Sequence, residues 1–202
     1  MTKTLTKALI GLTFAGALAL GVAPADAKPS SEASRLMKSR AAELYTVQVS
    51  SLKAGGGRVH IAAPLEATTR VTTDYGRYST MITQFEQSRI VGKKAGKTDV
   101  YLRVPILKGA GMIWAVIRFE PPQKLSDNEY VIKGTMVRGN VKRFDATYRL
   151  RRIDDSNTQL NLEMLIVPRL PFPNSRVAGE VSKACRSAVR QLRNATEAKH
   201  KK

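Results

Sequence analysis

The chain is poor in the residues that build cross-links and metal sites. Its 202 residues include one cysteine, Cys185, and two histidines, His60 and His200. A lone cysteine excludes an intramolecular disulfide framework and any zinc site built on cysteines. Since one of the two histidines lies in the basic C-terminal tail, the sequence offers no histidine-rich metal site. We therefore expect no bound metal and no cofactor.

Long apolar runs are equally scarce. The only one, residues 8–23, follows a basic start and precedes Ala25-Asp26-Ala27. This order is typical of a secretory signal peptide with an A-x-A cleavage site. No other stretch approaches the roughly 18 apolar residues that a membrane-spanning helix needs. We expect residues 1–27 to be a signal peptide, the mature chain to begin at Lys28, and the protein to be periplasmic or secreted.

Acidic side chains are too few to balance the basic ones. The chain has 34 Lys and Arg against 16 Asp and Glu, a net charge of +18, although 43% hydrophobic residues exclude a disordered basic tail. Such a charge attracts polyanions. Because export removes most nucleic acid from reach, we expect no nucleic-acid partner. The candidate partners are then anionic membrane surfaces, lipopolysaccharide and acidic polysaccharide. The alternative is a solvated basic surface without a partner.

The N-terminal half predicts a helix, a strand region and further short helices. Residues 28–45 form an expected N-terminal helical extension, followed by a main domain over 46–198 and a basic tail over 199–202. Within the first strand region, the run 55–57 of three glycines predicts a hairpin turn or a wide bulge, because glycine permits a positive φ. Residues 66–78 predict one or two short helices.

The C-terminal half predicts a meander of strands and a final helix. Asn174 or Ser175 is expected to cap that helix, which runs to about Ala198. Short turns between successive strands indicate an antiparallel sheet. The strands are expected at Phe85–Val91, Asp99–Ile106, Met112–Glu120, Tyr130–Arg138, Val141–Ile153 and Gln159–Val167.

This order of elements is that of the helix-grip fold. Residues 59–67 followed by 73–78 resemble the entry segment of START-like and polyketide cyclase/dehydrase proteins, where a strand ending in Ala-Pro leads to a helix and an Asp-Tyr-x-x-Tyr segment. Residues 88–91 and 143–150 resemble later strands of that family, which more often has Trp at the position of Tyr148. The resemblance covers roughly residues 47–195.

The resemblance implies an α+β fold of the SRPBCC superfamily, which also includes coenzyme Q-binding and birch-pollen-allergen-like proteins. We expect a curved seven-stranded antiparallel sheet wrapped around a long C-terminal helix, with two short helices after the first strand. Most relatives share an apolar cavity between sheet and helix, so the resemblance implies a hydrophobic or amphipathic small-molecule ligand such as a lipid or quinone.

Alternation along the strands and the helix stripe select the candidate lining of such a cavity. Tyr130 or Arg118 could orient a polar head group. The candidate ligand-binding residues are Leu102, Val104, Ile117, Phe119, Ile132, Met136, Tyr148, Met164, Val181, Ala184 and Ala188.

No constellation of polar residues indicates catalysis, and we assign no catalytic residue. Asp74-Tyr75 is interpreted as structural, and His60 as a solvent-facing histidine because it alternates with apolar neighbours. Asp154-Asp155 is expected at a hairpin tip, and Cys185 is expected to be a small buried side chain.

Three functions remain open. The leading hypothesis is an exported carrier of a lipid or other hydrophobic ligand, with a basic surface for anionic membranes. The second is a cyclase- or dehydratase-type enzyme that uses the same cavity. The third is a polyanion-binding envelope protein with a closed core. The oligomeric state is open as well.

Overall fold

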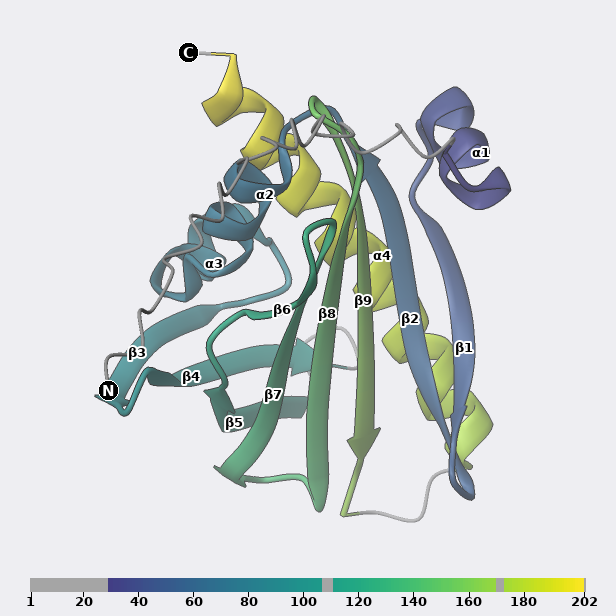
Figure 1. Ribbon diagram of the computed structural model, residues 1–202. Coiled ribbons are helices and arrows are strands. Elements are labelled where there is room, and N and C mark those ends of the chain that lie inside the picture. Colours follow the sequence, from purple (N-terminus) through teal and green to yellow (C-terminus); the bar gives the residue numbers. More distant parts are fainter. Residues whose placement is uncertain (1–28, 107–110, 170–172, 202) are drawn as a thin grey trace, which may run out of the picture.

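The computed structural model describes residues 29–106, 111–169 and 173–201, so the expected signal peptide lies outside the described residues. One antiparallel sheet curves around a long C-terminal helix (Figure 1). The elements are α1 (Ser31–Ser39), β1 (Glu43–Val49), β2 (Leu52–Ile61), α2 (Leu65–Thr72), η1 (Tyr75–Arg77), α3 (Tyr78–Met81), β3 (Gln87–Lys94), β4 (Lys97–Ile106), β5 (Gly111–Phe119), β6 (Gln123–Ser126), β7 (Glu129–Gly139), β8 (Arg143–Asp154), β9 (Asn157–Val167) and α4 (Asn174–His200).

The sheet confirms the predicted α+β architecture but has more strands than expected. Its order is β1-β2-β9-β8-β7-β5-β4-β3, with β6 paired to β7, which gives nine strands instead of seven. One addition is the β1–β2 hairpin, whose turn includes Ser50 at a φ of 53°. The other is β6, whose four residues are all exposed, so that no buried side chain marks it in the sequence.

The six strands predicted between residues 85 and 167 are confirmed, with ends that differ by a few residues. The prediction of a helical extension over residues 28–45 is partly wrong. The segment contains the predicted helix, but β1 begins inside it at Glu43.

The glycine run is neither a turn nor a bulge. Gly55, Gly56 and Gly57 lie in the middle of β2 and pair in continuous register with β1 on one side and β9 on the other. The only described glycine with a positive φ is Gly96. Gly55 and Gly57 are needed for a different reason, because α4 crosses β2 at this point (Figure 1) and its backbone leaves no room for their side chains. Gly56 faces the other side of the sheet, where a Cβ atom would meet the ring of Tyr45.

The start of α4 also differs from the prediction. Pro173 occupies the N-cap position, and no side chain caps the helix. Asn174 is used elsewhere, since its side-chain oxygen accepts the backbone N–H of Lys53 at 2.5 Å. This bond ties the beginning of α4 to the beginning of β2.

Helix α1 packs on the convex side of the sheet, over β2, and buries Ala33 and Leu36. His60 lies on this side too, but it is only 3% exposed, so the expectation of a solvent-facing histidine is wrong. Its Nε2 atom is 2.7 Å from Oδ1 of Asn157. Glu32 of α1 accepts a hydrogen bond from Gln159, the cross-strand neighbour of His60.

The main core fills the concave side, between the sheet and α2, α3 and α4. Within the described ranges, no helix combines the length and apolar character that a membrane crossing requires.

Candidate ligand-binding site

The predicted lining residues are brought together on the concave side. Most lie in one buried core with α4, as predicted from strand alternation. Four of the predicted residues are only half-buried: Val104, Met136, Met164 and Ala184. This difference divides the interior into a sealed end and an open end.

The sealed end lies beneath α2 and α3 and contains a group of aromatic residues. The ring of Tyr75 stacks on Phe119 with 4.3 Å between centroids. The hydroxyl of Tyr78 donates to the backbone carbonyl of Thr72 at 2.5 Å and lies 3.2 Å from the hydroxyl of Tyr148. Because Tyr78 has one proton to give, Tyr148 donates to Tyr78.

Burial raises the pKa of the Tyr75, Tyr78 and Tyr148 hydroxyls well above the ordinary tyrosine value. All three are therefore neutral at physiological pH. The structural interpretation of Tyr75 is confirmed by its stacking and burial.

The open end lies towards the start of α4. Six apolar side chains define it: Val104, Ile113, Met136, Met164, Ile166 and Val177. Strand register places the first five on the concave face, with Val104 opposite Ile113 and Met164 opposite buried Ala146. All but Val104 pack against the buried core, yet all six are less completely buried than the residues of the sealed end.

The two flanks of α4 explain why this end is open. At about 100° per residue, Val177 and Ala184 fall on one flank of the apolar stripe, and Ala178 and Ser182 fall on the other. The second flank is sealed against β1 and β2, and the first is half-exposed. Ile113, Ile166 and Val177 were missed as lining residues, although the same alternation and stripe could have identified them.

The two proposed head-group residues lie in different places. Arg118 is on the convex face, where its guanidinium binds both carboxylate oxygens of Asp99 at 2.7 Å and lowers the pKa of that carboxyl. Tyr130 packs against the edge of the core and also borders an outer hollow of about 410 Å³, beside Thr69 of α2 and Thr73 at its C-cap. Arg118 is therefore not a head-group residue.

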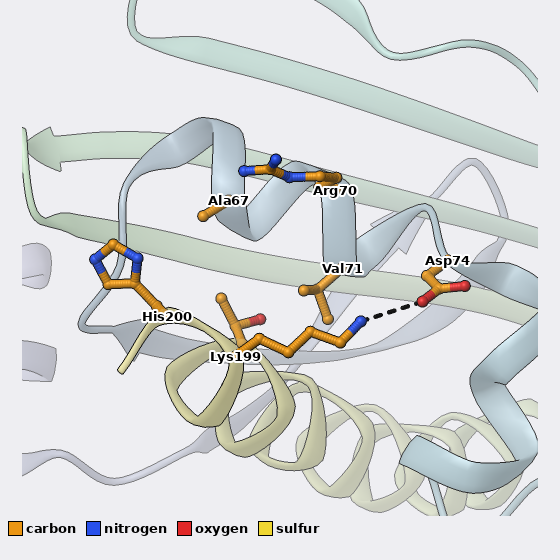
Figure 2. A pocket seen from close by; sticks show the side chains of 7 residues that line it. Ala67, Arg70, Val71, Asp74, Lys199 and His200 are labelled. Carbon is orange, nitrogen blue, oxygen red and sulfur yellow. Dashed lines mark hydrogen bonds and ion pairs between the residues drawn. The ribbon is translucent and has the colours of Figure 1, made fainter. Parts of the chain in front are cut away.

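A larger outer hollow, of about 630 Å³, separates α2 from the last turns of α4 (Figure 2). Lys199 extends across it to Asp74 at 3.2 Å. Arg70 and Lys199 stand in the last turns of their helices, where a cation stabilises the helix dipole. These structural roles account for the charges of Arg70 and Lys199. Lys199 and His200 belong to α4, so the expected tail is shorter than 199–202.

The remaining polar residues have structural roles. Cys185 is buried as predicted, its thiol lies 3.5 Å from the carbonyl oxygen of Gly55, and burial raises its pKa. Asp154 ends β8 at the predicted hairpin tip and accepts the backbone N–H of Ser156 at 2.9 Å. Among the described residues, no group of three or more His, Cys, Asp or Glu side chains is placed to hold a metal ion.

Comparison with solved structures identifies the architecture. A STAR-related lipid transfer protein from Xanthomonas axonopodis superposes with a TM-score of 0.65 at 15% identity, covering 77% of this chain and 93% of that one. The chain has the START-like helix-grip fold. Human StAR-related lipid transfer protein 5 has the same fold, with a TM-score of 0.65 at 10% identity and coverage of 79% and 84%.

The START-like fold is also that of an enzyme. The Zhui aromatase/cyclase from Streptomyces sp. R1128 matches with a TM-score of 0.54 at 19% identity, covering 79% of this chain and 94% of that one. No protein-family model matches the sequence, and no curated protein matches it. At these identities the START-like neighbours establish the fold and leave the ligand to be argued from the residues.

Proposed function

We propose that this protein is an exported carrier that holds a hydrophobic or amphipathic small molecule, such as a lipid or quinone, in the space beneath α4. The observation that carries the proposal is the open end, where apolar side chains on the concave face are only partly buried. Such side chains offer a surface that a hydrophobic ligand could cover.

Apolar burial supplies the affinity. Each methylene group that leaves water contributes about 0.8 kcal/mol. A ligand that buries about ten methylenes beneath α4 would gain about 8 kcal/mol before the costs of association are subtracted. Met136 and Met164 suit such a site, because their flexible thioether side chains can adapt to ligands of different shape.

The outer face of α4 carries positive charge that can attract the protein to anionic membranes. Arg176, Arg186 and Arg190 are exposed on this helix, and none of them forms an ion pair with another described residue. Each such side chain near an anionic bilayer is worth about 1 kcal/mol of attraction. We infer that this face brings the open end to anionic membranes, where ligand is loaded or released.

Native mass spectrometry tests the carrier function directly. Mature protein is taken gently from its own cell envelope, weighed intact and then extracted with organic solvent. A stoichiometric co-purifying lipid or quinone is the expected result. Protein that is empty from every preparation, with no uptake of added lipid, would overturn the proposal.

A variant that fills the open end locates the ligand. Met164→Trp adds bulk on the concave face and should reduce bound ligand at least tenfold without unfolding the protein. Leu125→Trp is the matched control, because Leu125 is 58% exposed on β6 and away from the interior. Equal ligand content in both variants would place the ligand elsewhere.

A further inference from the structure

The convex side of the sheet carries an aromatic pair that the sequence does not reveal. Tyr101 on β4 and Trp114 on β5 lie 6.2 Å apart between ring centroids, with 30° between their planes. The guanidinium of Arg89 on β3 lies over the Tyr101 ring at 5.5 Å from its centroid. Both side chains are partly exposed.

Strand register places arginines around this pair. In one row across the sheet, Arg89 stands opposite Tyr101, Tyr101 opposite Val116, and Val116 opposite Arg138. In the adjacent row, Arg103 stands opposite Trp114. At about 4.8 Å between strands, the first row spans about 14 Å. We call Arg89, Tyr101, Arg103, Trp114 and Arg138 the convex platform.

No described helix covers the convex platform, in which Arg89 and Arg138 are exposed and Tyr101, Arg103 and Trp114 are partly exposed. Helices α2, α3 and α4 lie on the concave side, and α1 covers β2 at the opposite margin (Figure 1). Of the three arginines, Arg103 has a carboxylate partner, Glu86 at 3.6 Å, in an exposed pair. Such pairs contribute at most about 1 kcal/mol, so that Arg103 is available to an incoming anion.

We propose that the convex platform binds an acidic polysaccharide. The flat rings of Tyr101 and Trp114 can cover the apolar faces of sugar rings, while the arginines bind carboxylate or sulfate groups bidentately. A chain that runs along the row meets a cation at each end and aromatic surface between them. The chain's net charge of +18 draws such a polymer towards the protein.

The choice of partner rests on the export that is part of the proposed function. A single-stranded nucleic acid could also stack on aromatic rings and pair with arginines. Outside the cytoplasm the polyanions within reach are anionic membranes, lipopolysaccharide and acidic polysaccharide, and the paired aromatic rings favour a chain of sugar rings among them. The convex platform is separate from the open end, so that failure of one site leaves the other testable.

Trp114 is the only tryptophan in the chain, and its fluorescence therefore reports on the convex platform alone. The full chain is titrated with polygalacturonate at low salt, with dextran as the neutral control and a single-stranded oligonucleotide as the competing polyanion. A saturable change in Trp114 emission with polygalacturonate, absent with dextran, is expected. Tighter binding of the oligonucleotide with the same emission change would overturn the choice of polysaccharide.

A pair of double variants separates local binding from general attraction. Arg89→Gln with Arg103→Gln removes two charges from the convex platform, and Arg186→Gln with Arg190→Gln removes two from α4. Polygalacturonate affinity should fall at least tenfold in the first and less than threefold in the second, while binding to anionic vesicles should show the reverse order. An equal loss of polygalacturonate affinity in both would show that only net charge matters and would overturn the proposal.

Discussion

Gly55 on β2 lies directly against the backbone of Ser182 on α4. A Cβ atom at Gly55 would be 2.4 Å from the Ser182 nitrogen, and one at Gly57 would be 2.4 Å from the nitrogen of Arg186. Beside this contact, the Ser182 hydroxyl lies 2.7 Å from the Tyr45 carbonyl oxygen of β1 and 2.8 Å from the Ala178 carbonyl oxygen of its own helix. Helix and strand thus meet backbone to backbone.

Alanine at Gly55 or Gly57 should destabilise the protein by about 3 kcal/mol, since the atoms in the way belong to a helix backbone and cannot move independently. Gly179→Ala on the same helix is the control. A Cβ there would have no atom within 4 Å, so the substitution should stabilise the helix by about 0.5–1 kcal/mol. Urea denaturation measures all three variants. Equal effects at Gly55 and Gly179 would contradict the close contact.

Tyr78→Phe should lower the free energy of unfolding by about 1–3 kcal/mol. The change leaves the buried carbonyl of Thr72 without its donor and the Tyr148 hydroxyl without its acceptor. Tyr101→Phe, on the half-exposed convex face, serves as the control and should change stability by less than about 0.5 kcal/mol. Thermal unfolding followed by circular dichroism distinguishes the two; a neutral Tyr78→Phe would show that the hydroxyl is dispensable.

The Cys185 thiol should not react with a disulfide reagent while the protein is folded. It is buried, and burial raises its pKa, so that the reactive thiolate is rare at neutral pH. A Ser175→Cys variant presents an exposed thiol and should react at once. The measured rate at Cys185 should follow global unfolding as urea is added. Fast reaction without denaturant would mean that α4 separates readily from β2.

The docking of α1 should weaken in acid. The hydrogen bond from Arg35 lowers the pKa of Glu43, and Arg58, 3.1 Å away, acts in the same direction. A carboxyl with a lowered pKa in the folded state stabilises fully above its unfolded value of about 4.3, and the stabilisation is lost as pH falls through the folded-state value.

Amide hydrogen exchange within α1, measured between about pH 3 and pH 6 and corrected for intrinsic rates, checks this linkage. Protection should fall with acid in the natural chain. In a Glu43→Gln variant it should be low throughout and change little. Glu180→Gln, which removes an exposed pair with Lys183, is the control and should leave the profile of the natural chain intact.

Local sequence patterns were sufficient for most of the fold. Turn residues and period-two alternation located six strands, and a spaced apolar stripe located α4, because these patterns follow from burying one face of each element. Strand β6 was not predicted, because none of its four residues is buried. The roles of Gly55 and Gly57 were not predicted because the backbone that requires them, at Ser182 and Arg186, lies more than a hundred residues away in the sequence.

The candidate site could be predicted in part for the same reason. Alternation selects the concave face, but it does not distinguish buried Ile132 from half-exposed Met136, which depends on where α4 lies. The burial of His60 depends on α1 and on Asn157, which no local pattern contains. The convex platform is likewise a product of register across four strands.

The backbone contact between α4 and β2 limits how the helix can move. One flank of α4 cannot move closer to the sheet, because its backbone is already in contact with Gly55 and Gly57. The other flank is only partly covered at Val177 and Ala184. Further along the helix that other flank is also tied down, where Gln191 accepts the backbone N–H of Thr83 and donates to Gln84. A ligand proposed to enter beneath α4 would therefore have to pass near Val177, with the helix itself staying in place.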